Sequence, residues 1–204
     1  MPTRRVVLGM LAASPALTRH GSQASGDDLA RAALRQVGVT TQYDHGYRRI
    51  AYPGGDVPRV TGVCADVIVR AARDAWNIDL QRLVHEDMLH AFAAYPTRWG
   101  LHGPDSNIDH RRVPNLETYW NRRGARLWHA ASRSWGFDFH GGLQPGDVLT
   151  WRTFLTGGPH VAIVVAGGRW PRIVQNHGWG AREDLLAIQW LDAAEAHYRW
   201  RPVL

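Results

Sequence analysis

The sequence predicts an α+β protein in which helices come first and an antiparallel sheet follows. Stretches with helical spacing of apolar residues occupy the first half of the chain, whereas short apolar runs separated by glycine and proline follow residue 136. Helices followed by a meander of strands are typical of the α+β class. The 204 residues suffice for one domain with its own core, and no repeat or linker divides the chain after residue 24. We therefore expect a single domain spanning 25–204.

Four helices are predicted in the first half of the chain. They span residues 27–37, 64–76, 80–95 and 116–123. The first has acids in its opening turn and stops at Gly38, and the third follows Asp79 as a capping residue and stops before Pro96. Residues 40–51 are polar and aromatic, which predicts irregular structure with one short strand.

Four strands are predicted in the second half. The apolar runs span residues 147–151, 160–166, 172–176 and 185–190. The segment 96–114 has turn-forming residues and no clear period, so we expect a loop there, with the polar stretch 104–115 on the surface.

The first 24 residues have the composition of an export signal. Arg4 and Arg5 precede an apolar run at 6–17, and a small-residue cleavage site lies near Ala24. The run is too short to remain as a permanent membrane anchor. The arginine pair also resembles a twin-arginine signal, so either export route is open. We expect a periplasmic or secreted protein; the alternative is a disordered N-terminus on a cytosolic one.

The charge of the chain argues against a nucleic-acid partner. The 24 basic residues are all arginine and face 18 acids, a net charge of +6. Loss of residues 1–24 leaves 21 arginines against 18 acids, a charge of +3. No basic block interleaved with aromatic residues is present. A modest positive charge suits an anionic polymer such as the cell wall.

Cys64, the only cysteine of the chain, begins the second predicted helix. Unpaired backbone N–H groups and the helix dipole at such a position favour thiolate over thiol. A single cysteine forms no internal disulfide, and an unpaired thiol in an oxidising compartment is more often reactive. The alternative is a small buried hydrophobic residue. We predict that Cys64 is a nucleophile, and we expect Asp66 in the same turn to point away from it.

A cysteine nucleophile needs an imidazole that takes and returns its proton and a group that orients the imidazole. His160 opens an apolar strand and is the predicted base. The next strand ends in Gln175, Asn176 and His177, and because side chains alternate along a strand the two amides cannot both face His160. An amide accepts a hydrogen bond without adding charge. We favour Asn176 as the orienting residue, then Gln175, then His177.

The order of these motifs resembles the NlpC-type cell-wall peptidases, which are circularly permuted relatives of papain. The resemblance rests on Tyr52, Gly54, Gly55 and Cys64, on the sequence PGD at 145–147 and on HVAI at 160–163. It implies a papain-like fold with catalytic Cys64 and His160. It also implies that Tyr52 helps the Cys64 backbone N–H stabilise an oxyanion, with simple packing of Tyr52 as the alternative.

Two positions depart from that family. Its usual Asp-Cys-Ser-Gly is VCAD at 63–66, and its third catalytic position, commonly histidine, falls at Gln175 or Asn176. The words YPGGDVP, GVCAD, LVHEDM, SNIDHRRVPNL and HYR also resemble an uncharacterised bacterial envelope family, domain of unknown function 1287. This second resemblance spans nearly the whole chain and implies little about the substrate.

The polar loop before the fourth helix is the predicted substrate-binding segment. Its candidate residues are Asp109, His110, Arg111 and Arg112. Arginine pairs bidentately with carboxylates, so Arg111 and Arg112 are suited to the acidic groups of a peptidoglycan stem peptide. The alternative is a buried salt-bridge network that holds the loop.

We expect no metal or other cofactor. His85 and His90 resemble a zinc-protease helix, but five residues turn a helix by about 500°, which leaves the rings roughly 140° apart. His102 and Asp109 lack the flanking ligands of a zinc D,D-peptidase. The stretch 105–116 lacks the turn glycine and the final carboxylate of a calcium loop.

Together these features predict an exported cysteine peptidase or amidase that cleaves an amide bond in peptidoglycan stem peptides through a thioester. One alternative is a non-catalytic wall-binding module on a degenerate peptidase fold. Another is the same Cys–His chemistry on a different substrate, such as acyl transfer or protein deamidation. The cleaved bond, the oligomeric state, and the choice between a housekeeping enzyme and a toxin with a cognate inhibitor are not predicted.

Overall fold

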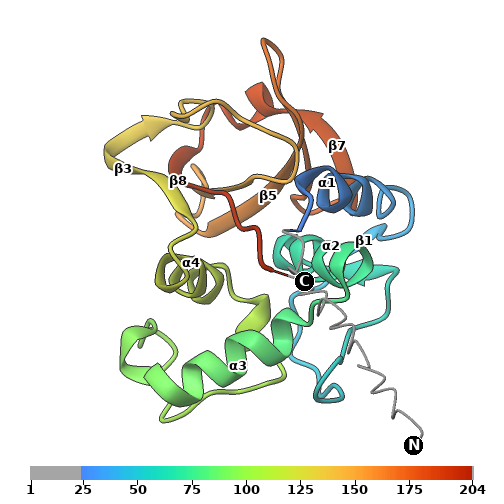
Figure 1. The fold of residues 1–204 in the computed structure, drawn as a ribbon, viewed down its shortest axis with the longest axis vertical. Coiled ribbons are helices and arrows are strands. Elements are labelled where there is room, and N and C mark those ends of the chain that lie inside the picture. The colour runs from blue at the N-terminus through green and yellow to red at the C-terminus, as the bar shows by residue number, and fades with distance from the viewer. Residues whose placement is uncertain (1–23, 204) are drawn as a thin grey trace, which may run out of the picture.

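A computed structural model describes residues 24–203 and has the predicted α+β architecture (Figure 1). Its helices are α1 (Gly26–Leu34), α2 (Cys64–Trp76), α3 (Leu80–Ala91) and α4 (Val113–Arg122), with 3-10 turns η1 (Phe92–Ala94), η2 (Asp109–Arg111) and η3 (Leu186–Gln189). Its strands are β1 (Gln42–Tyr43), β2 (Thr61–Gly62), β3 (Arg126–Trp135), β4 (Val148–Arg152), β5 (Pro159–Ala166), β6 (Arg172–Asn176), β7 (Ala181–Leu185) and β8 (Ala193–Tyr198). The predicted export signal, except for Ala24, lies outside the described residues.

Six strands form one antiparallel sheet in the order β3-β8-β4-β5-β6-β7, with β3 and β7 at its edges (Figure 1). The helices α1, α2 and α4 all contact β5 near the middle of the sheet, and α3 packs against α2 and α4. The short strands β1 and β2 form a separate parallel pair beside the start of α2.

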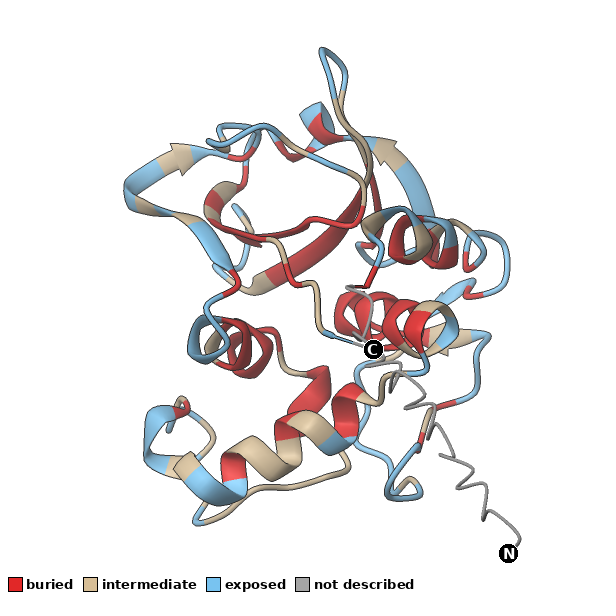
Figure 2. Ribbon diagram, in the orientation of Figure 1, coloured by how far each residue is buried: buried red, intermediate tan, exposed pale blue. Residues whose placement is uncertain are grey.

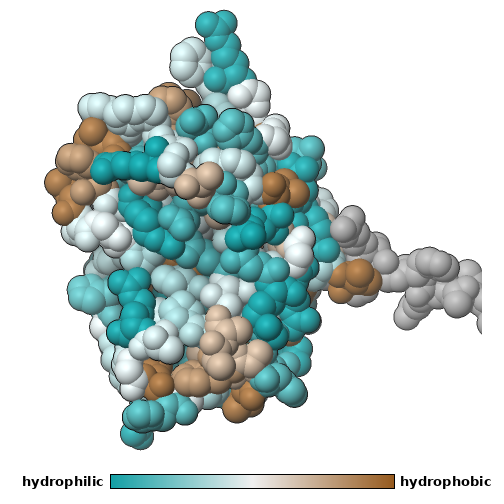
Figure 3. Space-filling model, turned by 90° about the vertical axis from the view of Figure 1, so that its left-hand side faces the viewer, coloured by the Kyte–Doolittle hydropathy of each residue, from teal (hydrophilic) through white to brown (hydrophobic). Residues whose placement is uncertain are grey.

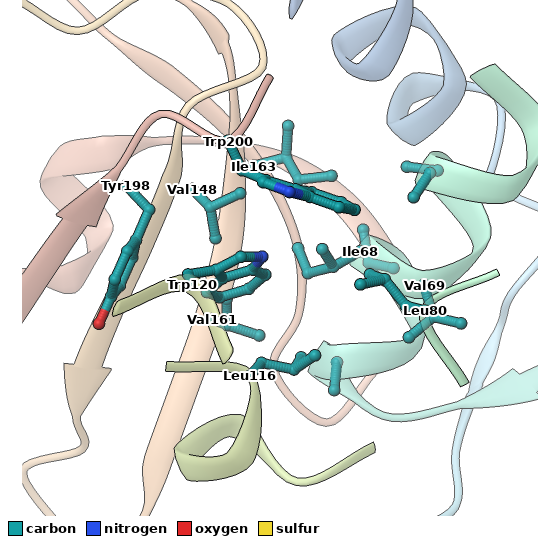
Figure 4. Close-up of a cluster of buried hydrophobic side chains, with 14 of the residues drawn as sticks. Ile68, Val69, Leu80, Leu116, Trp120, Val148, Val161, Ile163, Tyr198 and Trp200 are labelled. Atoms are coloured by element: carbon teal, nitrogen blue, oxygen red, sulfur yellow. The ribbon is translucent and has the colours of Figure 1, made fainter. Parts of the chain in front are cut away.

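The main core lies between the helices and one face of the sheet (Figures 2 and 4). Val161 and Ile163 of β5 point toward Ile68 of α2 and Trp120 of α4, and all four are at most 1% exposed within the described structure. A smaller cluster on the opposite face contains Trp151, Ala162 and Ile173, among other residues. Because side chains alternate along a strand, His160 shares this opposite face with Ala162, whereas the intervening Val161 faces α2.

The helix predictions are confirmed with shifted ends. The third predicted helix stops at Ala91 and continues as η1, and α4 begins at Val113 instead of residue 116. Pro114 lies in the first turn of α4, where proline's missing N–H costs nothing and its fixed φ suits a helix.

One strand prediction is wrong, and the strands β2, β3 and β8 were not predicted. Residues 185–190 form the end of β7 and then η3, because the apolar run there closes a turn after the strand 181–185. The unpredicted β8 has the sequence AAEAHY, and alanine and glutamate have low strand propensity. Pairing with β3 on one side and β4 on the other overrides that propensity.

The surface gives no sign of a membrane span in the described part of the chain. No helix within residues 24–203 has the length and apolar character to cross a bilayer. Figure 3 shows one face of the molecule, where hydrophilic residues cover most of the surface and hydrophobic ones form separate small patches.

Candidate active site

Cys64 is the first residue of α2, as predicted. The preceding Val63 has no polar side chain to cap the helix, so the carboxylate of Asp66 accepts a hydrogen bond from the Val63 N–H at 2.7 Å. This contact fixes the start of the helix immediately before the cysteine. Asp66 is thus turned back toward residue 63 instead of standing free beside the thiol.

The Cys64 thiol is buried against the backbone of β5. The residue is 5% exposed, and burial raises the pKa of the thiol to about 11. Hydrogen bonding to the backbone N–H groups of Val161, Ala65 and Cys64 lowers the pKa of the thiol, while the charge of Asp66 raises it. The helix-end effect predicted from the sequence therefore operates, but burial outweighs it. The contact with Val161 places the thiol beside the residue that follows His160.

His160 is held by Gln175. Its Nε2 lies 2.7 Å from Gln175 Oε1, and the Gln175 Nε2 donates to Asp184 Oδ2 at 3.0 Å. A carboxylate only accepts hydrogen bonds, so this second contact sets which end of the Gln175 amide is nitrogen. The oxygen then faces His160, whose Nε2 must carry the proton. The lone pair of the neutral imidazole is accordingly on Nδ1.

The predicted preference for Asn176 over Gln175 as the orienting residue is wrong in this structure. Asn176 is fully buried on the other face of β6, where its Nδ2 donates to the Gly62 carbonyl at 3.0 Å. Its Oδ1 accepts the N–H groups of Gly178 and Gly180. Asn176 thus ties the loop after β6 to the segment just before Cys64, and the alternation along the strand leaves Gln175 to meet His160.

Burial keeps His160 neutral. It lowers the pKa of the imidazole to about 3, and the charge of His177 acts in the same direction, while the hydrogen bond to Gln175 opposes both. The His160 and His177 rings are 4.5 Å apart between centroids in an edge-to-face arrangement. The Nε2 of His177 lies 3.8 Å from Asp192 Oδ2. His177, third in the predicted order, therefore packs against the His160 ring instead of orienting it.

The tyrosine beside the thiol is Tyr43, and the prediction of Tyr52 is not supported by the geometry. The loop that contains Tyr52 is anchored to α3, because the N–H of Gly54 binds Asp79 and that of Gly55 binds Gln81. Tyr52 is consequently 43% exposed, with its ring 4.9 Å from that of His85.

Tyr43 reaches the site through the β1–β2 pair, in which it lies opposite Gly62, two residues before Cys64. Its pKa is raised by burial first and then by the charge of Cys64 and a hydrogen bond to it. The residue as a whole is 40% exposed. Sequence reasoning missed Tyr43 because a two-residue strand leaves no periodic signal.

Of the four predicted substrate-binding residues, three are buried and only Arg112 is partly exposed at the Cys64 cavity. Arg111 forms a buried bidentate pair with Asp66, both contacts at 2.9 Å, so the salt-bridge alternative holds for this residue. Arg111 also lines the cavity that contains Cys64. Asp109 is also buried and accepts from Arg112 at 2.9 Å, and burial lowers the pKa of His110 to about 4. Asp109 and His110 therefore hold the loop and do not line the site.

Two neighbouring cavities flank the candidate site. Cys64 lines one of about 370 Å³ together with Tyr47, Trp99 and Arg112, and the Arg112 guanidinium lies 4.2 Å from the Trp99 ring centroid. His160 lines another of about 740 Å³ that includes Trp179. Tyr43 and Pro159 border both cavities. An extended substrate therefore has space on either side of the cysteine and histidine.

The described residues contain no group of three or more histidine, cysteine, aspartate or glutamate side chains placed to hold a metal ion. The chemistry available at the site is that of a thiol, an imidazole whose tautomer is set by an amide, and a phenol at hydrogen-bond range of the sulfur.

The fold and site define an α+β protein with a cysteine at the start of a helix and a histidine at the start of a central strand, where the residue after that histidine contacts the thiol. Within that class the chain belongs to the family described as domain of unknown function DUF1287, whose model matches residues 30–200. It is 43% identical over 175 residues to the uncharacterized protein YijF of Escherichia coli (strain K12), which covers 84% of this chain and 80% of that protein. The predicted membership of this family is confirmed.

Proposed function

We propose that this protein is an exported cysteine hydrolase with a papain-like fold that cleaves an amide bond in peptidoglycan stem peptides. The observation that carries the proposal is the Val161 N–H contact to the Cys64 sulfur, which brings the thiol to the strand end where Gln175 holds His160. A helix-end thiol, a base and an orienting amide are the minimum set for nucleophilic catalysis by cysteine.

The protonation states favour a general-base route instead of a preformed thiolate–imidazolium pair. Burial raises the thiol pKa and lowers the imidazole pKa, so both groups are neutral at pH 7. As the Cys64 sulfur attacks the carbonyl carbon, its proton passes to His160 Nδ1. The oxyanion is stabilised by the Cys64 backbone N–H and the Tyr43 hydroxyl, each such donor contributing about 10²–10³ in rate.

The second half of the reaction restores the enzyme. His160 returns the proton to the leaving amine, the C–N bond breaks, and a thioester to Cys64 remains. Water then gives a proton to His160 and its oxygen attacks the thioester carbon. The C–S bond breaks, the sulfur regains the proton, and the carboxylic acid leaves.

The substrate class follows from the lining of the Cys64 cavity and from the chain's charge. Arg112 is partly exposed there and carries a guanidinium suited to a carboxylate, and stem peptides contain several carboxylates. The charge of +3 after loss of the first 24 residues is compatible with an anionic wall. Export of the protein to the periplasm or beyond is part of the proposal.

A wall-binding module is the second candidate, and the buried thiol with its raised pKa is the observation that favours it. The same chemistry on another substrate, as acyl transfer or deamidation, is the third. These candidates differ in what happens to the wall and to the cysteine.

The test is digestion of purified peptidoglycan by the protein lacking residues 1–24 and by its Cys64→Ala and His160→Ala variants, with mass spectrometry of the products. New fragments from the wild type alone would establish the hydrolase and identify the bond. Intact wall that co-sediments equally with wild type and Cys64→Ala would favour the binding module. Intact wall without co-sedimentation would direct the search to another substrate.

A further inference from the structure

We propose that Asp184 is a positioning residue that sets the tautomer of His160 through the amide of Gln175. The inference deepens the proposed function and rests on it for the catalytic role of His160. Neither the sequence motifs nor the resemblance pointed to Asp184, which lies on the edge strand β7.

The contacts form a chain from the sheet edge to the base. Asp184 Oδ2 accepts from Gln175 Nε2 at 3.0 Å, and Gln175 Oε1 lies 2.7 Å from His160 Nε2. Gln189 of η3 also donates its Nε2 to Gln175 Oε1. Gln175 and Gln189 are each 3% exposed, so water does not readily replace their hydrogen-bond partners.

Gln175 has three side-chain partners, and of these only Asp184 has one fixed hydrogen-bonding role, that of an acceptor. An amide can turn its oxygen and nitrogen around at little steric cost, so two amides facing one another can reverse together. An ionised carboxylate has acceptors alone. Asp184 therefore requires the nitrogen end of Gln175, which leaves the oxygen end for His160 and Gln189.

A reversed Gln175 amide would change the chemistry of the site. Its nitrogen would face His160, so the imidazole Nε2 would become an acceptor and the proton would move to Nδ1. The lone pair needed to receive the proton of Cys64 would then be bound to Gln175. The orientation of one amide thus decides whether His160 acts as a base toward the thiol.

The experiment compares Asp184→Leu with Asp184→Asn and with a matched control, Glu183→Gln. Glu183 is the neighbouring acid on β7, exposed and paired with Arg172. Asparagine retains an acceptor for Gln175, whereas leucine retains none. Long-range ¹H–¹⁵N spectra of protein labelled in histidine report the tautomer, and the His160 signals are assigned by their loss in His160→Gln.

The expected result is an Nε2–H tautomer of His160 in the wild type and in Glu183→Gln and a mixture with Nδ1–H in Asp184→Leu. Asp184→Asn should lie between them, because its amide offers an acceptor to Gln175 but can also reverse. On peptidoglycan, Asp184→Leu lowers kcat roughly tenfold with KM unchanged, less than the 10²–10⁴ expected for loss of the base itself. A pure Nε2–H signal in folded Asp184→Leu overturns the proposal. So does an Nδ1–H signal in the wild type, a result that needs no variant to fold.

The proposed hydrolase activity and the role of Asp184 can be refuted independently. A wild type that leaves the wall intact but shows the expected tautomers removes the proposed function and keeps the structural role of Asp184. A wild type that digests the wall while Asp184→Leu keeps its tautomer and its kcat removes the role of Asp184 and keeps the function.

Discussion

Two buried polar networks meet at the first turn of α2, and they use different chemistry. On one side Asp66 and Arg111 form a bidentate ion pair, and Arg111 also binds the backbone carbonyl of Asp44 at 3.1 Å. On the other side His160 contacts the uncharged amide of Gln175, and the carboxylate of Asp184 binds the far end of that amide without touching His160. Permanent charges thus hold the backbone around Cys64, whereas the hydrogen bond to His160, the proposed base, comes from an uncharged amide.

The difference has a physical reason. A carboxylate in direct contact with His160 would favour the imidazolium, and a guanidinium would oppose it, so either would bias the base toward one state. An amide binds the ring in either state at smaller electrostatic cost. The Asp66–Arg111 ion pair is suited to a fixed structural role, because both partners stay charged. Loss of either partner leaves the other as a buried charge without a counter-ion.

Replacement of Arg111 tests the ionic network and should have the largest effect on stability. Arg111→Ala leaves Asp66 buried without its partner, which we expect to lower the free energy of unfolding by about 3–5 kcal/mol. Urea unfolding followed by circular dichroism measures it. Arg82→Ala is the matched control, because the Arg82–Glu86 pair is exposed on both sides and its loss should cost at most about 1 kcal/mol. Equal losses for the two arginines would contradict the structural role of the Asp66–Arg111 pair.

The adjacent amides of β6 are expected to have different roles: Asn176 stabilises the fold, and Gln175 orients His160, the proposed base. Asn176→Ala removes hydrogen bonds to Gly62, Gly178 and Gly180, and we expect it to lower the free energy of unfolding by about 1–3 kcal/mol. Gln175→Leu should instead lower kcat on peptidoglycan roughly 10–10²-fold, because His160 loses its orienting acceptor. Paired unfolding and digestion measurements decide between them. A larger loss of kcat in folded Asn176→Ala would restore Asn176 as the orienting residue.

Protonation of His160 is expected to limit the stability of the neutral network in acid. Burial lowers the folded pKa to about 3, below the ordinary 6.5, so the unfolded state binds more protons as the pH falls between these values. The free energy of unfolding should therefore fall by about 1–3 kcal/mol more in the wild type than in His160→Gln between pH 7 and pH 4. His110, lowered to about 4, acts in the same direction and remains in both proteins. Parallel pH profiles would mean that His160 is not buried as a neutral ring.

Much of the fold was predictable because its signals are local. The helix α2 was predicted to start at Cys64 and to end near Trp76, since an acid in the first turn and an apolar face lie within the segment itself. The strand β8 was not, because its sequence AAEAHY favours a helix and only pairing with two distant strands decides its structure. Cys64 and His160 were identified from their positions at the starts of a helix and a strand.

The remaining site residues depend on contacts between distant segments. Tyr43 reaches Cys64 because two residues pair in β1 and β2, and Tyr52 leaves it because its loop is bound to α3. The choice between Gln175 and Asn176 depends on the phase of β6, which a five-residue run does not specify. Asp184 comes from a strand that was misplaced by several residues. These details follow from tertiary pairing, which composition and periodicity do not encode.

The pH dependence of Cys64 alkylation is the smallest of the expected effects and the sharpest test of the comparison. Burial raises the thiol pKa to about 11, so thiolate is scarce at neutral pH and the rate with iodoacetamide should be lower than that of free cysteine. The rate should rise as the pH passes 9 and approaches 11, in the protein lacking residues 1–24 and in the Glu183→Gln control alike. A plateau already reached below pH 8 would mean that Cys64 and His160 form a thiolate–imidazolium pair. The two networks at the start of α2 would then both be ionic, and His160 would serve mainly as an acid toward the leaving amine.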